Sequence, residues 1–140
     1  SDRTVDLEDY VLSLIFDRPE LLEYEWVQQF ASQFFHKSEN REVFAACLTY
    51  REPSAIKNSL DPSLHTFLNE LTDIKLESSD KKESEAALSQ CLWRLEVRHW
   101  QELQDGLLSD LADSETPAKE LEAAITPVNT RLKELFAQRE

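Results

Sequence analysis

Glycine is almost missing from this chain of 140 residues, and methionine is missing altogether. The single glycine, Gly106, and five prolines leave little material for the tight turns that connect many short strands. A phosphate-binding loop needs several glycines within a few residues, so one glycine excludes it. Sparse glycine therefore argues against a β-rich fold and against a nucleotide-binding loop.

Residues that carry metal or nucleophilic chemistry are equally scarce. Cys47 and Cys91 are isolated, each within an apolar helical pattern, and an apolar helix face does not lower the pKa of a thiol. The three histidines, His36, His65 and His99, form no Cys-x-x-Cys or His-Glu-x-x-His pairing. We therefore predict no catalytic residue, no metal site, no cofactor and no small-molecule substrate, and we favour an interaction domain over an enzyme.

Two further features are absent from the sequence. No apolar run approaches the length of a membrane span, and no secretory leader is recognisable. Two isolated cysteines do not form a disulfide framework, so we expect a reducing cytoplasm and no membrane contact. Because the chain opens at Ser1 and holds no methionine, we also expect it to be a fragment of a longer protein.

Positively charged residues are scarce relative to negatively charged ones. Asp and Glu total 28 against 15 Lys and Arg, which gives a formal net charge of -13. Duplex DNA requires clustered Lys and Arg, so the balance disfavours direct nucleic-acid binding. A protein partner with a basic or mixed surface is easier to reconcile with this charge, although the acid excess can also serve solubility alone.

What the chain does contain is helix-forming sequence. Hydrophobic residues make up 41%, and Leu, Glu, Ala and Gln recur throughout. A mostly apolar helix is predicted over 5–17, followed by a short helix opened by Pro19. Ser38 is predicted to cap the next long helix, and Asp61 is predicted to cap another that begins at the following proline. We expect an all-α helical bundle in this part of the chain.

A long helix is predicted from about Asp80, which can act as its N-cap, to about Ala112. Its apolar residues form two stripes about a third of a turn apart. The first stripe holds Leu88, Cys91, Leu92 and Leu95; the second holds Trp93, Val97, Trp100, Leu103, Leu107 and Leu111. One helix with two buried faces indicates two packing units, and we predict a bundle subdomain over 1–98 and a hairpin subdomain over 99–140.

The hairpin is predicted from a short polar connection and one further apolar stripe. Folding the chain about residues 114–115 makes the last two helices antiparallel and brings Trp93 near Phe136 and Trp100 near Val128. Pro127 is expected to kink or locally break the last helix. The predicted partner-binding residues of the hairpin are Leu108, Arg131, Lys133, Phe136 and Arg139.

Three segments, in order, resemble a known family. They are Tyr10-Val-Leu-Ser-Leu-Ile-Phe-Asp-Arg-Pro-Glu-Leu-Leu22, Asn40-Arg-Glu-Val-Phe44 and Cys91-Leu-Trp-Arg-Leu-Glu-Val-Arg98. Together they resemble the C-terminal helicase-binding domain of bacterial DnaG-type primases. The resemblance implies a bundle followed by a hairpin that contacts the N-terminal domain of the replicative DnaB-type helicase and recruits primase for primer synthesis. It implies no catalytic motif in this region.

Three alternatives stay open. The N-terminal domain of the helicase itself has a similar bundle, but the long helix here leads into a terminal hairpin instead of a linker. A generic helical scaffold would form an extended dimer. A small helical enzyme fragment would turn over a substrate, and the missing motifs argue against it.

Overall fold

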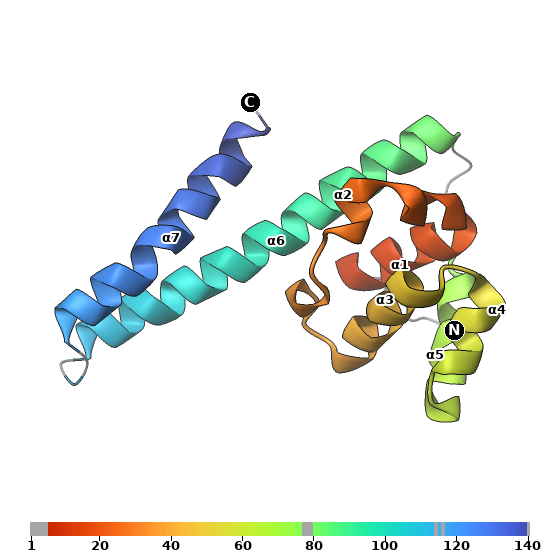
Figure 1. Ribbon diagram of the computed structural model, residues 1–140, viewed down its shortest axis with the longest axis horizontal. Helices are drawn as coiled ribbons and strands as arrows, with labels where there is room; N and C mark the ends of the chain where they lie inside the picture. The colour runs from red at the N-terminus through yellow and green to blue at the C-terminus, as the bar shows by residue number, and fades with distance from the viewer. Residues whose placement is uncertain (1–5, 77–79, 114, 116, 140) are drawn as a thin grey trace. The chain divides into compact units, whose positions relative to one another are not determined.

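The computed structural model describes residues 6–76, 80–113, 115 and 117–139. Within these ranges every regular element is a helix, so the prediction of an all-α fold is confirmed (Figure 1). The elements are α1 (Leu7–Asp17), η1 (Pro19–Glu23), α2 (Glu25–Gln28), η2 (Ser32–Phe34), α3 (Ser38–Tyr50), α4 (Pro53–Ser59), η3 (Pro62–Leu64), α5 (His65–Asp73), α6 (Lys81–Ala112) and α7 (Ala118–Ala137), where η marks a 3₁₀ helix. No described helix is long and apolar enough to cross a membrane.

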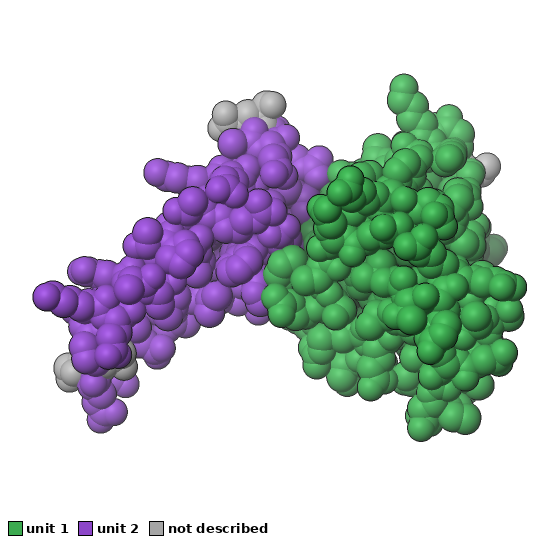
Figure 2. All heavy atoms as spheres, viewed as in Figure 1, with its two compact units in different colours: residues 1–92 green, residues 93–140 purple. Residues whose placement is uncertain are grey.

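The chain divides into two compact units, an N-terminal unit (Ser1–Leu92) and a C-terminal unit (Trp93–Glu140), coloured separately in Figure 2. This boundary lies inside α6 and earlier than the predicted boundary between residues 98 and 99. The physical reason is that Trp93 and Val97 already pack within the hairpin. The two subdomains predicted over residues 1–98 and 99–140 stay a prediction.

Helix α1 starts at an acidic cap. The Asp6 carboxylate accepts a hydrogen bond from the backbone N–H of Asp9 at 2.8 Å, so Asp6 is the N-cap and the helix begins at Leu7. The predicted start at residue 5 was therefore wrong, and residue 5 itself lies outside the described residues. The Ser13 hydroxyl joins α1 to α5, since it donates to the backbone carbonyl of Leu71 at 3.0 Å.

The core of the N-terminal unit is built from fully buried aromatic and aliphatic side chains. Phe35 and Phe44 lie 5.0 Å apart between ring centroids, and Phe30 meets both rings edge to face. Val11, Leu12, Leu21, Leu22, Val27, Val43 and Cys47 have no exposed area. Burial raises the pKa of the Cys47 thiol to about 12, which agrees with the expectation that its apolar helix face does not lower that pKa.

Two of the three predicted helix caps are present in the structure. Ser38 is the first residue of α3 and not its cap, which is Lys37. Asp61 does act as a cap, because its carboxylate accepts from the Ser63 backbone N–H at 2.8 Å. Asp80 likewise accepts from the Glu83 backbone N–H at 2.8 Å at the start of α6.

The C-terminal unit contains the end of α6 and all of α7. Helix α7 continues without interruption through Pro127, so the predicted break is wrong. Proline at this position removes one backbone hydrogen bond, and the helix absorbs the loss while Val128 next to it stays buried. The polar connection between the two helices falls partly outside the described residues.

Candidate functional site

The two helices of the hairpin enclose a small apolar core. Val97 from α6 meets Val128, Leu132 and Leu135 from α7, and Trp93, Trp100 and Leu107 pack against this cluster at its margin. The predicted stripe of α7 is buried at Leu121, Val128, Leu132 and Leu135, and its remaining member, Ile125, is partly exposed. Leu103 and Leu111 belong to the predicted stripe of α6, yet they are 41% and 45% exposed. The stripe is therefore wider than the surface that one neighbouring helix can cover.

Trp93 fastens the end of α7 to α6. Its indole Nε1 donates to the backbone carbonyl of Leu135 at 2.7 Å, and this carbonyl lies in the last turn, where helix carbonyls lack intrahelical partners. The Phe136 ring meets the Trp93 ring edge to face at 5.6 Å, which confirms the predicted pairing. The Arg139 guanidinium lies over the Trp93 ring at 5.2 Å. Trp93 thus organises two of the predicted partner-binding residues.

One side of the hairpin is closed by charge. Arg131 donates to both carboxylate oxygens of Glu96, from Nε at 2.7 Å and from Nη2 at 3.1 Å, and to Glu134 at 3.1 Å. The Trp100 indole adds a further hydrogen bond to Glu96 at 2.9 Å. We call Glu96, Trp100, Arg131 and Glu134 the closed edge. Arg131, predicted as a partner contact, joins α6 to α7, and its contact with a partner stays a prediction.

The contacts within the closed edge shift the pKa values of Glu96 and Arg131. Burial alone would raise the pKa of Glu96, but hydrogen bonds from Arg131 and Trp100 outweigh it and lower that pKa. The hydrogen bond to Glu96 raises the pKa of Arg131. The pair is therefore ionised at neutral pH.

The other side of the hairpin is open. A shallow groove of about 650 Å³ runs between the helices. It is lined by Gln101, Gln104, Asn129, Leu132, Lys133, Phe136 and Ala137, which we call the open edge. Gln104 donates to the Asn129 side chain at 2.7 Å, so its middle is a pair of amides from opposite helices.

The open edge brings together two of the predicted partner-binding residues. Lys133 and Phe136 line the same groove, and Phe136 is 46% exposed. Leu108, 48% exposed, follows Gln101 by seven residues and Gln104 by four, and these spacings place it on the same side of α6. The structure thus aligns Leu108, Lys133 and Phe136 on one side.

Charge is unevenly distributed along the hairpin. Between residues 101 and 122 the sequence has seven acidic side chains and one lysine. The groove, in contrast, has Lys133 as its one charged residue among the described lining residues. A partner that covers both Leu108 and Phe136 therefore meets an acidic surface toward the connection between the helices and a cation near the end of α7.

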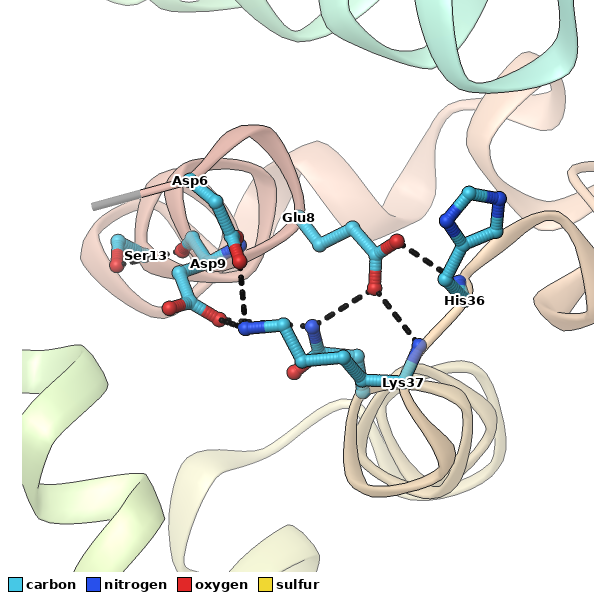
Figure 3. A network of polar contacts seen from close by, with 7 residues as sticks. Asp6, Glu8, Asp9, Ser13, His36 and Lys37 are labelled. Atoms are coloured by element: carbon cyan, nitrogen blue, oxygen red, sulfur yellow. Dashed lines mark hydrogen bonds and ion pairs between the residues drawn. The ribbon is translucent and has the colours of Figure 1, made fainter. Parts of the chain in front are cut away.

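Two buried carboxylates in the N-terminal unit form a second polar site that the sequence analysis missed (Figure 3). Glu8 and Asp9 are 2% and 0% exposed. The Glu8 carboxylate accepts from the backbone N–H groups of His36 at 2.7 Å and Lys37 at 3.2 Å, and from the Asn40 side chain at 2.9 Å.

Asp9 and Asp6 complete this cluster through Lys37. The Lys37 ammonium lies 3.3 Å from Asp9 and 2.5 Å from Asp6. Burial lowers the pKa of Lys37. Hydrogen bonds and electrostatic attraction to Asp6 and Asp9 raise that pKa by more than burial lowers it, so the net shift is upward. These contacts bind α1 to the start of α3, which gives the carboxylates a structural task. The only hint in the sequence is that both acids sit within an otherwise apolar helix.

We compared the chain with known families, curated proteins and solved structures, and none of them matches.

Proposed function

We propose that this chain is the non-catalytic helicase-interaction domain of a bacterial DNA primase. In this proposal the open edge of the hairpin, together with Leu108, binds the N-terminal domain of a DnaB-type replicative helicase. The resemblance of the three segments to primase domains motivates the choice of family, and the open edge supplies a surface suited to the task.

The observation that carries the proposal is the asymmetry of the hairpin. On the closed edge the polar groups satisfy one another through the Glu96–Arg131 pair. On the open edge an aromatic ring and a lysine lie in one groove, with an exposed leucine aligned beside them. Exposed aromatic side chains flanked by polar groups are typical of residues that dominate binding energy at protein interfaces.

The proposed mechanism is recruitment. Docking on the helicase keeps the polymerising part of the primase close to newly exposed single-stranded DNA, which converts a bimolecular search into a local one. Repeated release requires modest affinity, and the small open edge suits an interface of the transient class. The acidic surface repels nucleic acid, so the domain leaves DNA contact to other parts of the assembly.

Isothermal titration calorimetry of the full chain against the N-terminal domain of a DnaB-type helicase tests the proposal. We expect a dissociation constant of about micromolar, or roughly 8 kcal/mol of binding free energy. Lys133→Glu should weaken binding about tenfold, whereas Lys82→Glu, the same charge change on the N-terminal unit, should leave it unchanged. Absence of binding by the folded wild type would overturn the proposal and favour a generic helical scaffold.

A further inference from the structure

A second groove, of about 400 Å³, lies in the N-terminal unit between α3 and the end of α4. It is lined by Glu42, Ala45, Ala46, Thr49, Tyr50, Ser59, Leu60 and Asp61. Every lining residue belongs to the N-terminal unit, so the groove is independent of the hairpin and of the function proposed for it.

The lining of this groove, which we call the Tyr50 groove, combines three chemical features. Ala45, Ala46 and Leu60 supply an apolar surface. Tyr50 is 50% exposed, more than any other large hydrophobic side chain of the described residues. Glu42 and Asp61 supply carboxylates, and none of the described lining residues is basic.

Both carboxylates are available to a cation from outside. Among the described residues neither Glu42 nor Asp61 forms an ion pair. Hydrogen bonds from the Ser63 backbone and hydroxyl lower the pKa of Asp61, so this group stays ionised at neutral pH. One Asp61 oxygen accepts from the Ser63 N–H, and a carboxylate can accept further bonds on its remaining lone pairs.

The backbone beside Tyr50 takes an uncommon conformation. Arg51 has φ 61° and ψ -38°, and the Glu52 N–H donates to the Tyr50 carbonyl at 2.7 Å, as in a γ-turn. A positive φ is disfavoured for a residue with a side chain. The Arg51 guanidinium pairs with Glu23 at 3.1 Å, and Arg41, the neighbour of Glu42 in sequence, donates to the backbone carbonyls of Phe35 at 3.0 Å and His36 at 2.6 Å.

We propose that the Tyr50 groove binds an arginine side chain presented by a loop or extended segment of a partner protein. The guanidinium plane stacks on the Tyr50 ring, its N–H groups donate to Glu42 and Asp61, and its aliphatic stem covers the apolar floor. A lysine ammonium lacks the planar surface for stacking, and a phosphate group meets two carboxylates of its own sign.

The test is a nuclear magnetic resonance titration of the ¹⁵N-labelled full chain with N-acetyl-arginine methylamide. The matched control ligand is the citrulline analogue, which has nearly the same shape and no charge. We expect millimolar, saturable shifts of the Ala45, Ala46 and Tyr50 amides with arginine, and affinity lower by about fivefold or more with citrulline. Equal affinity for both ligands, or shifts centred elsewhere, would overturn the inference.

Variants test whether the arginine ligand binds in the Tyr50 groove. Tyr50→Leu and Glu42→Gln should each reduce arginine affinity several-fold while circular dichroism shows an unchanged fold. Asp73→Asn, an equal loss of charge at an exposed position outside the groove, should have no effect. If the groove variants bind arginine as the wild type does, the assignment is wrong, whatever the result of the helicase titration.

Discussion

The two units of this protein differ in how many side chains they bury. The N-terminal unit surrounds Phe35 and Phe44 completely, and it also encloses the carboxyl groups of Glu8 and Asp9. The C-terminal unit has two helices and encloses fewer side chains, although Leu135 is only 1% exposed. Its core cluster has four buried members, while Phe136 and Leu108 remain about half exposed.

We propose that this difference assigns stability mainly to the N-terminal unit and partner binding to the hairpin. Multiple helices around one core give the N-terminal unit a large apolar contribution to folding. The hairpin depends more on two polar contacts between α6 and α7. The Trp93 hydrogen bond joins the helices at the end of α7, and the Glu96–Arg131 pair joins them along the closed edge. Because those bonds leave the opposite side uncovered, apolar groups there remain available to a partner.

The largest predicted effect on stability comes from replacing one phenylalanine by alanine in each unit. Phe44→Ala should lower the free energy of unfolding by about 3–5 kcal/mol, because it removes a fully buried ring and leaves a cavity. Phe136→Ala removes a half-exposed ring and should cost about 1 kcal/mol, mostly the contact with Trp93. Guanidinium denaturation followed by circular dichroism measures both. Equal losses would show that the hairpin is packed as tightly as the bundle.

The next effect concerns the buried carboxylates. Glu8→Ala should lower the free energy of unfolding by about 2–3 kcal/mol, since it leaves the Asn40 amide and two backbone N–H groups without their acceptor. Asp17→Asn, an exposed acid on the same helix, should cost less than about 0.5 kcal/mol. Similar small losses for both variants would mean that the cluster does not hold α1 to α3.

A smaller effect is expected on the closed edge of the hairpin. Glu96→Gln should cost about 1 kcal/mol at pH 7, a modest figure because Arg131 is partly exposed. Tryptophan fluorescence in a Trp26→Phe background reports this loss, because the remaining indoles, Trp93 and Trp100, both lie in the hairpin.

The pH dependence of that loss has a definite sign. The folded-state pKa of Glu96 is lowered, so its stabilisation is present above the unfolded value of about 4.3 and disappears as the pH falls through the folded-state pKa. The difference between wild type and Glu96→Gln should therefore shrink as the pH falls below the unfolded value. A difference that grows on acidification would contradict the ionised pair.

The positions of the helices could be predicted from the sequence better than the burial and pairing of their side chains. Periodicity located the long helix, the antiparallel hairpin and the Trp93–Phe136 contact, because each rests on helical spacing. Helix α4 was not predicted. It begins at Pro53, and proline suits the first turn of a helix as well as a break between helices.

Burial of polar groups could not be inferred from spacing. Glu8 and Asp9 are enclosed because His36, Lys37 and Asn40, distant in sequence, supply donors. Arg131 was predicted to face a partner, but its position opposite Glu96 depends on the register of two helices. Leu103 and Leu111 were predicted inside because a stripe does not reveal how much surface its neighbour covers.

The central claim, that the open edge of the hairpin is the docking surface, is tested most directly by two exposed apolar residues on different sides. Phe136 lines the groove and Leu103 does not, although they are 46% and 41% exposed. In calorimetry with the helicase N-terminal domain, Phe136→Ala should weaken binding at least about tenfold, and Leu103→Ala should leave it unchanged. Equal losses in the two variants, or loss with Leu103→Ala alone, would contradict the account.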